Sequence, residues 1–341
     1  MKNANGRSRK PAAFLGIDFG ATKLKAVVTD RSGRALAKVV QQSIVEEGQS
    51  ATLARLGIFT RRVTARIEGC GYRIVAAGVG ACGLVDYANG VLIQSVVLPG
   101  WHSAPLAKVV SESLGVPTAI ENDANLAILG EWWRGAARGH RVVAGLTLGT
   151  GIGGGLIIDG EVYRGGSGYG TEFGHIQVAG ASPRCGCGNT GCLGRVASAT
   201  ATLQRYNGSL RPKQPAIMDI RELIEAARDG NRRAEGCLAQ SVHYLAKASL
   251  ILINCLNPNC FVFTGGMAML GNGLLRSVRS RLDGRTYDDI ARTTQLATAR
   301  LGIHSGSYGA AYLALSRSKH HRAVKFRDAS STRRATHSSG G

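Results

Sequence analysis

Short apolar runs, most of them ending in glycine, alternate with amphipathic stretches through the middle of this chain. The apolar runs have the length of β-strands and lie at residues 12–20, 23–30, 73–80, 142–149 and 260–266. The amphipathic stretches have helical length and lie at residues 106–115, 124–135, 219–230 and 234–258. This alternation predicts an α/β fold.

Capping residues define the ends of two of these helices. Asp219 and Gly230 are placed as N-cap and C-cap of one helix, and Asn257 followed by proline stops the longest one. Residues 205–218 contain one glycine and two prolines, so they are predicted to form a surface connection.

The length and the apolar content predict two packed lobes. The chain has 341 residues, of which 44% are hydrophobic, more than a single core usually needs. It has no run of eighteen apolar residues, and its polar start, MKNANGRSRKP, lacks the apolar core of a secretion signal. We therefore expect a cytoplasmic protein with no membrane partner. There its eight cysteines would stay reduced, so closely spaced cysteines favour metal or thiol chemistry over disulfides.

The positive charge is concentrated at the two ends of the chain. The formal net charge is +20, of which residues 1–10 supply +4 and residues 317–341 supply +6 (seven basic side chains against one aspartate). Both ends are rich in small polar residues, so we predict disordered tails at 1–11 and 318–341. No specific nucleic-acid partner is expected, although a general attraction to polyanions stays open.

Three glycine-rich turns could hold a nucleotide. The turn at residues 18–23 joins two predicted strands, and its backbone amides and the Thr22 hydroxyl could cradle phosphate. A second turn within residues 147–155 again joins strand to strand, and its five glycines allow the backbone to approach a ligand closely. A third, at residues 264–266, follows a strand and precedes a helix, as an adenosine platform could.

Two phosphate-type hairpins are the signature of the actin-like ATPase fold. In that fold two ribonuclease H-like lobes each offer a β-hairpin to a nucleotide that lies in the cleft between them. The sequence has neither a GxxxxGK[ST] loop nor a GxGxxG between strand and helix, so P-loop and Rossmann folds are disfavoured. We predict an N-terminal lobe over residues 12–122, completed by a C-terminal helix over 306–317, and a C-terminal lobe over 123–305.

A candidate catalytic carboxylate lies at the start of the helix predicted after residue 123. Asp123 is near the helix N-terminus, where the helix dipole favours the ionised form. An ionised carboxylate can accept the proton of a hydroxyl that attacks phosphorus, and the neutral Asn122 can bind another hydroxyl. Helix capping is the alternative role for both residues.

A histidine and three cysteines have the spacing of a metal site. His175 is followed ten residues later by Cys185, and then by Cys187 and Cys192. One imidazole and three thiolates make a closed tetrahedral zinc site with a structural role. The alternative is a set of reduced surface thiols.

Taken in order, these motifs resemble the ROK family of sugar kinases and sugar-responsive repressors. They are DFGATK, LPGW, ENDAN, TLGTGIGGG, EFGH, the CxCxxxxC cluster and FTGG, and the match covers about residues 13–316. The resemblance is to glucokinase-like members. It implies an actin-like ATPase fold. It also implies a carbohydrate kinase that transfers phosphate from ATP, with Mg²⁺, to a hexose. The first choice of substrate is glucose, phosphorylated at its 6-hydroxyl.

The resemblance also implies roles for individual residues. Phosphate contacts, with magnesium nearby, are implied at Asp18, Gly20, Thr22, Lys23, Thr150 and Gly151. Adenosine contacts are implied at Gly265 and Gly266. Sugar contacts are implied at Gly83, Asn122, Asp123, Glu172 and His175. Asp123 would be the general base, and His175 would also bind Zn²⁺ with Cys185, Cys187 and Cys192.

Three positions depart from the family pattern. Gly194 stands where the family has a sugar-binding glutamate two residues after the last cysteine. Cys82 replaces a proline in the segment that ends at Asp86, and Val97 replaces an asparagine before LPGW. All three departures concern sugar recognition rather than phosphate transfer.

Several alternatives stay open. N-acetylglucosamine, N-acetylmannosamine, mannose, fructose and allose are other substrates, and polyphosphate is another donor. The repressor branch carries a DNA-binding domain ahead of the kinase-like body, whereas seventeen residues precede Asp18 here, so a DNA-binding regulator is disfavoured. The missing carboxylate at Gly194 keeps a catalytically weak sugar sensor as the rival function. A homodimer or higher homo-oligomer is expected.

Overall fold

The computed structural model describes residues 10–180, 183–212 and 214–318, and they form two compact units. Unit 1 contains the described residues up to Asp123 together with those from Ala310 onward. Unit 2 is Ala124–Gly309. The predicted disordered tails lie outside the described residues, except for residues 10, 11 and 318.

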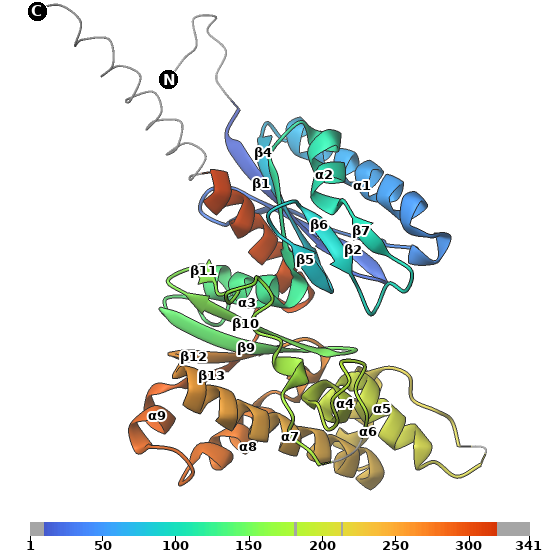
Figure 1. Ribbon diagram of the computed structural model, residues 1–341, viewed down its shortest axis with the longest axis vertical. Helices are drawn as coiled ribbons and strands as arrows, with labels where there is room; N and C mark the ends of the chain where they lie inside the picture. The colour runs from blue at the N-terminus through green and yellow to red at the C-terminus, as the bar shows by residue number, and fades with distance from the viewer. Residues whose placement is uncertain (1–9, 181–182, 213, 319–341) are drawn as a thin grey trace, which may run out of the picture. The chain divides into compact units, whose positions relative to one another are not determined.

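Unit 1 is built on a five-stranded sheet of order β3-β2-β1-β4-β8 (Figure 1). Its strands are β1 (Ala12–Phe19), β2 (Lys23–Thr29), β3 (Ala35–Gln42), β4 (Arg73–Ala81) and β8 (Thr118–Asn122). The first three strands are antiparallel neighbours, whereas β4 runs parallel to β1 and β8 parallel to β4. The strands predicted at 12–20, 23–30 and 73–80 are thereby confirmed.

Helices cover both faces of this sheet, which explains why β1 is apolar at almost every position. On one side lie α1 (Gln49–Gly69) and α2 (Leu106–Leu114), and on the other lies the C-terminal helix over 305–318 (Figure 1). Gly78 on β4 permits close packing of that last helix, because a Cβ there would lie 2.1 Å from the carbonyl oxygen of Ala310. A small sheet of β5 (Leu84–Asp86), β6 (Val91–Gln94) and β7 (His102–Ala104) and the short helix η1 (Val45–Glu47) complete the unit.

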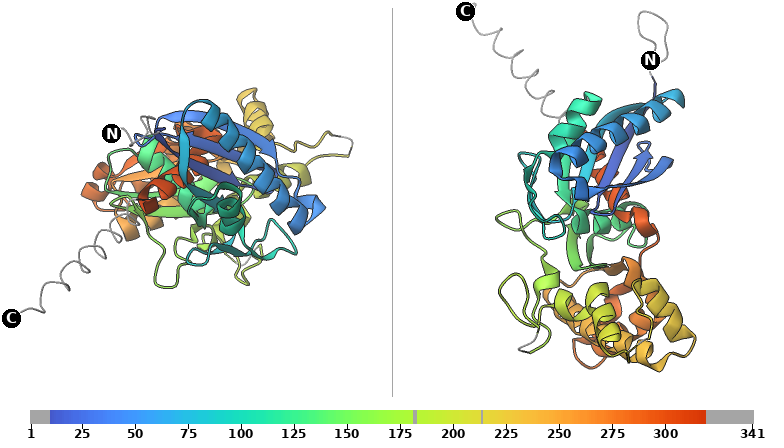
Figure 2. Two further views of the ribbon diagram at one scale, coloured as in Figure 1. Left: turned by 90° about the horizontal axis from the view of Figure 1, so that it is seen from above. Right: turned by 90° about the vertical axis from the view of Figure 1, so that its right-hand side faces the viewer.

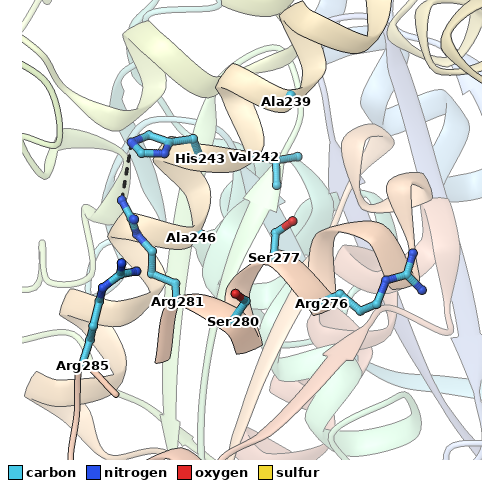
Figure 3. A pocket seen from close by; sticks show the side chains of 9 residues that line it. All are labelled: Ala239, Val242, His243, Ala246, Arg276, Ser277, Ser280, Arg281 and Arg285. Carbon is cyan, nitrogen blue, oxygen red and sulfur yellow. Dashed lines mark hydrogen bonds between the residues drawn. The ribbon is translucent and has the colours of Figure 1, made fainter. Parts of the chain in front are cut away.

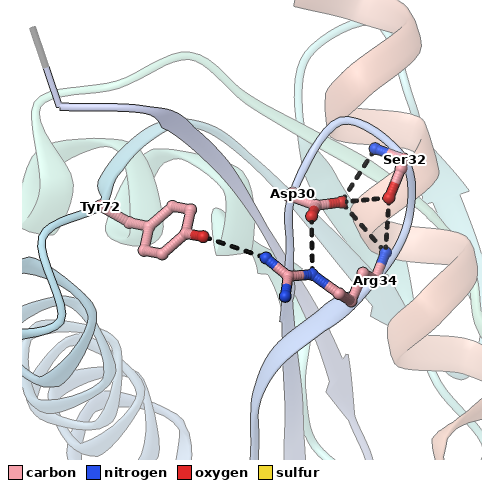
Figure 4. A network of polar contacts seen from close by, with 4 residues as sticks. All are labelled: Asp30, Ser32, Arg34 and Tyr72. Carbon is pink, nitrogen blue, oxygen red and sulfur yellow. Dashed lines mark hydrogen bonds and ion pairs between the residues drawn. The ribbon is translucent and has the colours of Figure 1, made fainter.

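A polar network fixes the turn between β2 and β3 (Figure 4). The Asp30 carboxylate accepts hydrogen bonds from the backbone and the hydroxyl of Ser32 and from the backbone and Nε of Arg34. Arg34 in turn donates to the Tyr72 hydroxyl at 3.1 Å. Burial alone would raise the pKa of Asp30, but the hydrogen bonds from Ser32 and Arg34 outweigh it and hold that pKa below its ordinary value.

Unit 2 repeats the strand order of unit 1. Its sheet has the order β11-β10-β9-β12-β13, which is third, second, first, fourth and fifth along the chain, as in the first sheet. The strands are β9 (Val142–Leu148), β10 (Ile152–Ile158), β11 (Glu161–Val162), β12 (Cys260–Thr264) and β13 (Gln295–Thr298). Again three strands are antiparallel and two are parallel. Each unit is therefore a ribonuclease H-like lobe, and the predicted actin-like ATPase fold is confirmed.

The helices of unit 2 lie on the two faces of its sheet in unequal numbers. One face carries α3 (Asp123–Arg134), and the other carries most of the remaining helices (Figures 1 and 2). These are α4 (Leu193–Ala197), α5 (Ala199–Gly208), α6 (Ile220–Arg228), α7 (Arg232–Leu256), α8 (Asn272–Leu282) and α9 (Asp288–Thr293), with the short η2 (Phe173–His175) and η3 (Gly266–Leu270). The short η4 (Gly302–His304) instead adjoins α3, because Leu301 and Ser305 on either side of it donate hydrogen bonds to Glu131 of that helix.

The long helix α7 forms the centre of this helical layer. By length and composition it is the one described helix that could cross a membrane, but half of its most apolar window is buried inside the unit. It packs against α4, α5, α6 and α8. Its apolar character is accounted for by its position in the core of the lobe.

The predicted helices are found within about two residues of their expected ends. Asp219 caps α6 as predicted, while the C-cap is Asp229 and Gly230 follows with φ of 88°. Asn257 ends α7 in the left-handed conformation. The prediction that residues 205–218 form a surface connection is wrong at its start, because α5 continues to Gly208 and buries Tyr206 in the core.

Candidate functional site

The first glycine-rich turn lies at one end of the β1–β2 hairpin of unit 1. Its chain reversal is tight, since the Gly20 amide donates to the Lys23 carbonyl at 3.2 Å. Thr22 and Lys23 are exposed, as a phosphate contact requires. The Asp18 carboxylate is largely shielded from solvent and forms an ion pair of 2.7 Å with Lys25.

Two residues that sequence reasoning missed support this turn. Lys25 lies opposite Asp18 in the register of the hairpin, so the prediction of a tight two-strand turn could have found it. Ser43 is buried; its hydroxyl donates to the Gly20 carbonyl at 2.5 Å, and its amide donates to the Thr22 carbonyl at 3.0 Å. No local pattern indicates Ser43, because it follows β3 and reaches the turn only through sheet pairing.

Two of the predicted sugar-binding residues of unit 1 lie at the ends of neighbouring parallel strands. β4 and β8 pair with Ala81 opposite Asn122, so both chains leave the sheet at the same edge. The Asn122 side-chain amide donates to the Gly83 carbonyl at 3.2 Å. Gly83 has φ of 132°, and a Cβ there would lie 2.2 Å from the Gln94 carbonyl oxygen, so only glycine fits.

Asp123 is the first residue of α3, directly after β8. The following residues of the helix contact β10 and its surroundings in unit 2. A Cβ on Gly153 would lie 2.6 Å from the Ala124 methyl, and the Thr171 hydroxyl donates to the Asn125 side chain at 2.9 Å. The glycines of β10 thus allow the N-terminal turn of α3 to pack closely against that strand.

The second glycine-rich turn connects β9 and β10. The Gly149 amide donates to the Gly151 carbonyl at 3.0 Å, and Thr150 and Gly151 are exposed. Gly265 adjoins this turn, because a Cβ there would lie 2.5 Å from the Leu148 carbonyl oxygen. Gly265 has φ of 93°, and Gly266 follows it as the first residue of η3. The structure therefore brings the predicted phosphate and adenosine residues of unit 2 to one end of its sheet.

The four predicted metal ligands form one cluster. The ligand atoms of His175, Cys185, Cys187 and Cys192 all lie within 4.8 Å of one another. His175 Nδ1 lies 3.5 Å from the sulfur of Cys185, and the sulfurs of Cys187 and Cys192 are 3.7 Å apart. Zinc bonds of about 2.3 Å to sulfur and about 2.0 Å to nitrogen in a tetrahedron give edges of roughly 3.8 Å and 3.5 Å. The cluster therefore fits a tetrahedral Zn²⁺.

Cys187 and Cys192 of this cluster differ in pKa in opposite directions from the ordinary value of a thiol. A backbone hydrogen bond from Asn189, and then one from the side chain of Cys185, lower the pKa of Cys187 to about 7. Burial, followed by hydrogen bonding to Cys187, raises the pKa of Cys192 to about 12. A metal that needs three thiolates would release protons on binding.

Glu172 and Gly194 lie beside the metal cluster. The Glu172 carboxylate is 4.0 Å from Nε2 of His175, beyond hydrogen-bond distance, whereas Nδ1 of the same ring faces Cys185. Gly194 lies in the first turn of α4, where a Cβ would be 3.4 Å from the Gly174 carbonyl oxygen. A side chain at position 194 would thus start next to η2, which carries His175.

Comparison with known proteins identifies the family. The model of the ROK family matches residues 14–317. The chain belongs to the ROK family. The glucokinase of Thermotoga maritima is 33% identical over 308 residues, covering 87% of this chain and 96% of that protein. The xylose repressor of Bacillus subtilis is 27% identical over 304 residues, covering 89% of this chain and 77% of the repressor.

Solved structures of ROK proteins have the same fold. The ROK hexokinase from Thermus thermophilus superposes with a TM-score of 0.76 at 33% identity, covering 90% of this chain and 99% of that one. A ROK glucokinase from Streptomyces griseus, solved in complex with glucose and AMPPNP, has a TM-score of 0.74 at 30% identity and covers 89% of this chain and 99% of that one. The resemblance drawn from the sequence motifs is confirmed.

Proposed function

We propose that this ROK protein phosphorylates glucose at its 6-hydroxyl with ATP, using Asp123 as the general base. The chain is a carbohydrate kinase, since it belongs to the ROK family and shares 33% of its residues with a glucokinase along almost the whole of that enzyme. The position of Asp123 carries the mechanistic proposal. It opens α3, and the next turn of that helix packs on β10, the strand that leaves the second phosphate turn.

The proposed reaction transfers one proton and one phosphoryl group. The sugar hydroxyl gives its proton to an Asp123 carboxylate oxygen as that hydroxyl oxygen bonds to the terminal phosphorus, and the bond from phosphorus to the bridging oxygen breaks to leave ADP. The first turn of α3 favours the ionised carboxylate through the helix dipole. Asn122, held by the Gly83 carbonyl, is placed to bind a second sugar hydroxyl.

The remaining site residues are proposed in the same roles that the family resemblance implies. Phosphate contacts are assigned to Asp18, Gly20, Thr22, Lys23, Thr150 and Gly151, and adenosine contacts to Gly265 and Gly266. Sugar contacts are assigned to Gly83, Asn122, Asp123, Glu172 and His175. Mg²⁺ bound with ATP neutralises charge on the phosphates. Zn²⁺ held by His175, Cys185, Cys187 and Cys192 would fix η2, and with it Glu172, from one side.

The wider organisation is proposed on the same basis. We propose two lobes, one of residues 12–122 completed by 306–317 and the other of residues 123–305 with the zinc-binding loop. We propose a cytoplasmic homodimer or higher homo-oligomer without membrane or specific nucleic-acid partners, acting in carbohydrate metabolism and glycolysis.

A coupled assay of ADP formation over a hexose panel tests the function. Glucose should give the highest kcat/KM among glucose, mannose, fructose, allose and the N-acetylhexosamines. Asp123→Asn should lower kcat by about two to four orders of magnitude, the range for a lost general base, and leave nucleotide affinity nearly unchanged. Turnover like that of the native enzyme in this variant would remove Asp123 from the mechanism.

A catalytically weak sugar sensor is the second candidate function. Gly194 favours it, because the family's sugar-binding carboxylate is missing, and ROK relatives include a xylose repressor. The same assay separates the two functions. A sensor would bind a sugar in calorimetry with no more ADP formation than the Asp123→Asn variant shows.

A further inference from the structure

A cationic groove runs between α7 and α8 of unit 2 (Figure 3). Its volume is about 470 Å³, within the range of small-molecule sites. Val242 and two alanines of α7 supply its apolar part. Its polar part consists of His243, Arg276, Ser277, Ser280, Arg281 and Arg285. None of the described residues that line the groove is acidic.

The positive charges of the groove lack counter-charges. Among the described residues, the side chains of Arg276 and Arg285 have no ion-pair or hydrogen-bond partner, and the side chain of Arg281 donates only to Nε2 of His243, at 3.4 Å. Figure 3 shows the guanidinium groups of Arg281 and Arg285 directed to the same side of the groove as His243.

Other arginines of the same unit do find carboxylates. Arg221 pairs with Asp219, and Arg292 pairs with Asp288. The groove is therefore a local excess of positive charge, and an anion held there would relieve the repulsion between neighbouring guanidinium groups.

The groove is separate from the phosphate and adenosine turns. α8 begins just after η3, close to Gly266 at the carboxyl end of β12, and Arg281 lies in its last turn. After Arg285 the chain continues through α9 to the start of β13, which runs parallel to β12. Arg281 and Arg285 thus lie toward the opposite end of the sheet from Gly266.

We propose that this groove binds an anion that carries two or more phosphate groups. Figure 3 shows the Arg276 guanidinium on the opposite side of Ser277 and Ser280 from Arg281 and Arg285. An anion that contacts both charged ends must therefore be longer than a single phosphate. The hydroxyls of Ser277 and Ser280 lie between the two charged ends and can donate to it. This binding site is additional to the proposed kinase site and does not depend on it.

Calorimetric titration of the full chain with tripolyphosphate tests the proposal. One equivalent of tripolyphosphate should bind in the groove of the native chain. The double variant Arg281→Gln/Arg285→Gln, the groove variant, should bind that equivalent at least tenfold more weakly, a loss of at least about 1.4 kcal/mol. The control is Arg62→Gln/Arg66→Gln, which removes the same charge from two exposed positions of α1. It should change the affinity less than twofold. Any binding at the phosphate turns is common to all three proteins, so the lost binding event identifies the groove.

Further probes identify the source of the phosphate groups and set the limits of the proposal. Orthophosphate should bind more weakly than tripolyphosphate. If the native chain binds a second equivalent of ATP that the groove variant does not bind, the ligand of the groove is a nucleotide. If only tripolyphosphate shows such a groove-dependent equivalent, the ligand is an inorganic phosphate chain. Equal weakening in the groove and control variants, or no groove-dependent equivalent for any probe, would overturn the proposal. Because the readout is binding heat, it is independent of whether glucose is the kinase substrate.

Discussion

Glu131 of α3 offers the sharpest test of how unit 2 is held together. Its side chain is fully buried, and each carboxylate oxygen accepts two hydrogen bonds. Oε2 accepts from the amides of Ala136 and Arg300, at 2.8 and 3.0 Å. Oε1 accepts from the amide of Leu301 and the hydroxyl of Ser305, at 3.0 and 2.8 Å. One carboxylate thus joins the end of α3 to the start of the C-terminal helix, a connection across more than 160 residues of sequence.

Glu131→Gln keeps the volume of the side chain and changes only its acceptors. The less costly orientation places the new NH₂ at Oε1, because the Ser305 hydroxyl can rotate to accept from it. The Leu301 amide is then left buried without an acceptor, which costs about 1–3 kcal/mol. The two hydrogen bonds kept at Oε2 weaken because their acceptor no longer carries a charge, while the cost of burying that charge is removed. The net loss from these two effects is about 1 kcal/mol. We expect a loss of about 2–4 kcal/mol, or about 4–16 °C in Tm for a unit of this size.

Thermal unfolding followed by circular dichroism and urea titration at pH 7 measure this loss. Glu225→Gln is the matched control, because Glu225 is exposed on α6 of the same unit and should change stability by less than about 1 kcal/mol. Ser305→Ala should give an intermediate loss, since it removes one donor and leaves the carboxylate three others. A Glu131→Gln variant as stable as the Glu225→Gln control would refute the reasoning.

Three further predictions concern the metal cluster, the sugar pocket and acid stability. Purified protein should hold about one zinc per chain by elemental analysis, and Cys187→Ser should lower the zinc content, Tm and sugar affinity. Cys255 is an exposed cysteine outside the cluster, so Cys255→Ser should leave all three unchanged. Gly194→Glu should lower the KM for glucose about ten- to a hundredfold, the value of a hydrogen bond to a charged group, and leave the KM for ATP unchanged. If this variant folds like Gly194→Ala but keeps the native KM and selectivity, position 194 does not set specificity. The native pKa of Asp30 lies below its ordinary value of 3.8, so the contribution of this carboxylate to the free energy of unfolding should be complete above pH 5. It should disappear as the pH falls through the lower native value. A difference in the free energy of unfolding between the native chain and Asp30→Asn that persists unchanged at about pH 2 would contradict this.

Motifs with a local physical reason could be predicted from the sequence. The hairpin turns at 18–23 and 149–151 are predictable because in each an apolar strand stops at a glycine and a second strand follows within a few residues. The metal cluster is predictable because its ligands lie within eighteen residues of one another, from His175 to Cys192. Helix α7 is predictable because an asparagine that tolerates the left-handed conformation, followed by proline, ends a long apolar face. α1 gave no such signal, since Thr52, Gly57 and Thr60 interrupt its buried face.

The tertiary structure decided what depends on contacts between distant segments. Lys25 neutralises Asp18 through strand register, and Ser43 supports the first turn from the end of β3. Glu131 is indistinguishable in sequence from a solvated helix residue until residues 300–305 fold over it. The arginines of α8 likewise form a groove only because α7 lies beside them. The sequence by itself determines sites whose residues lie close together along the chain. The burial and pairing of charged side chains are decided only by the tertiary structure, because they depend on segments that are distant in sequence and are brought together by the packing of helices on the sheet.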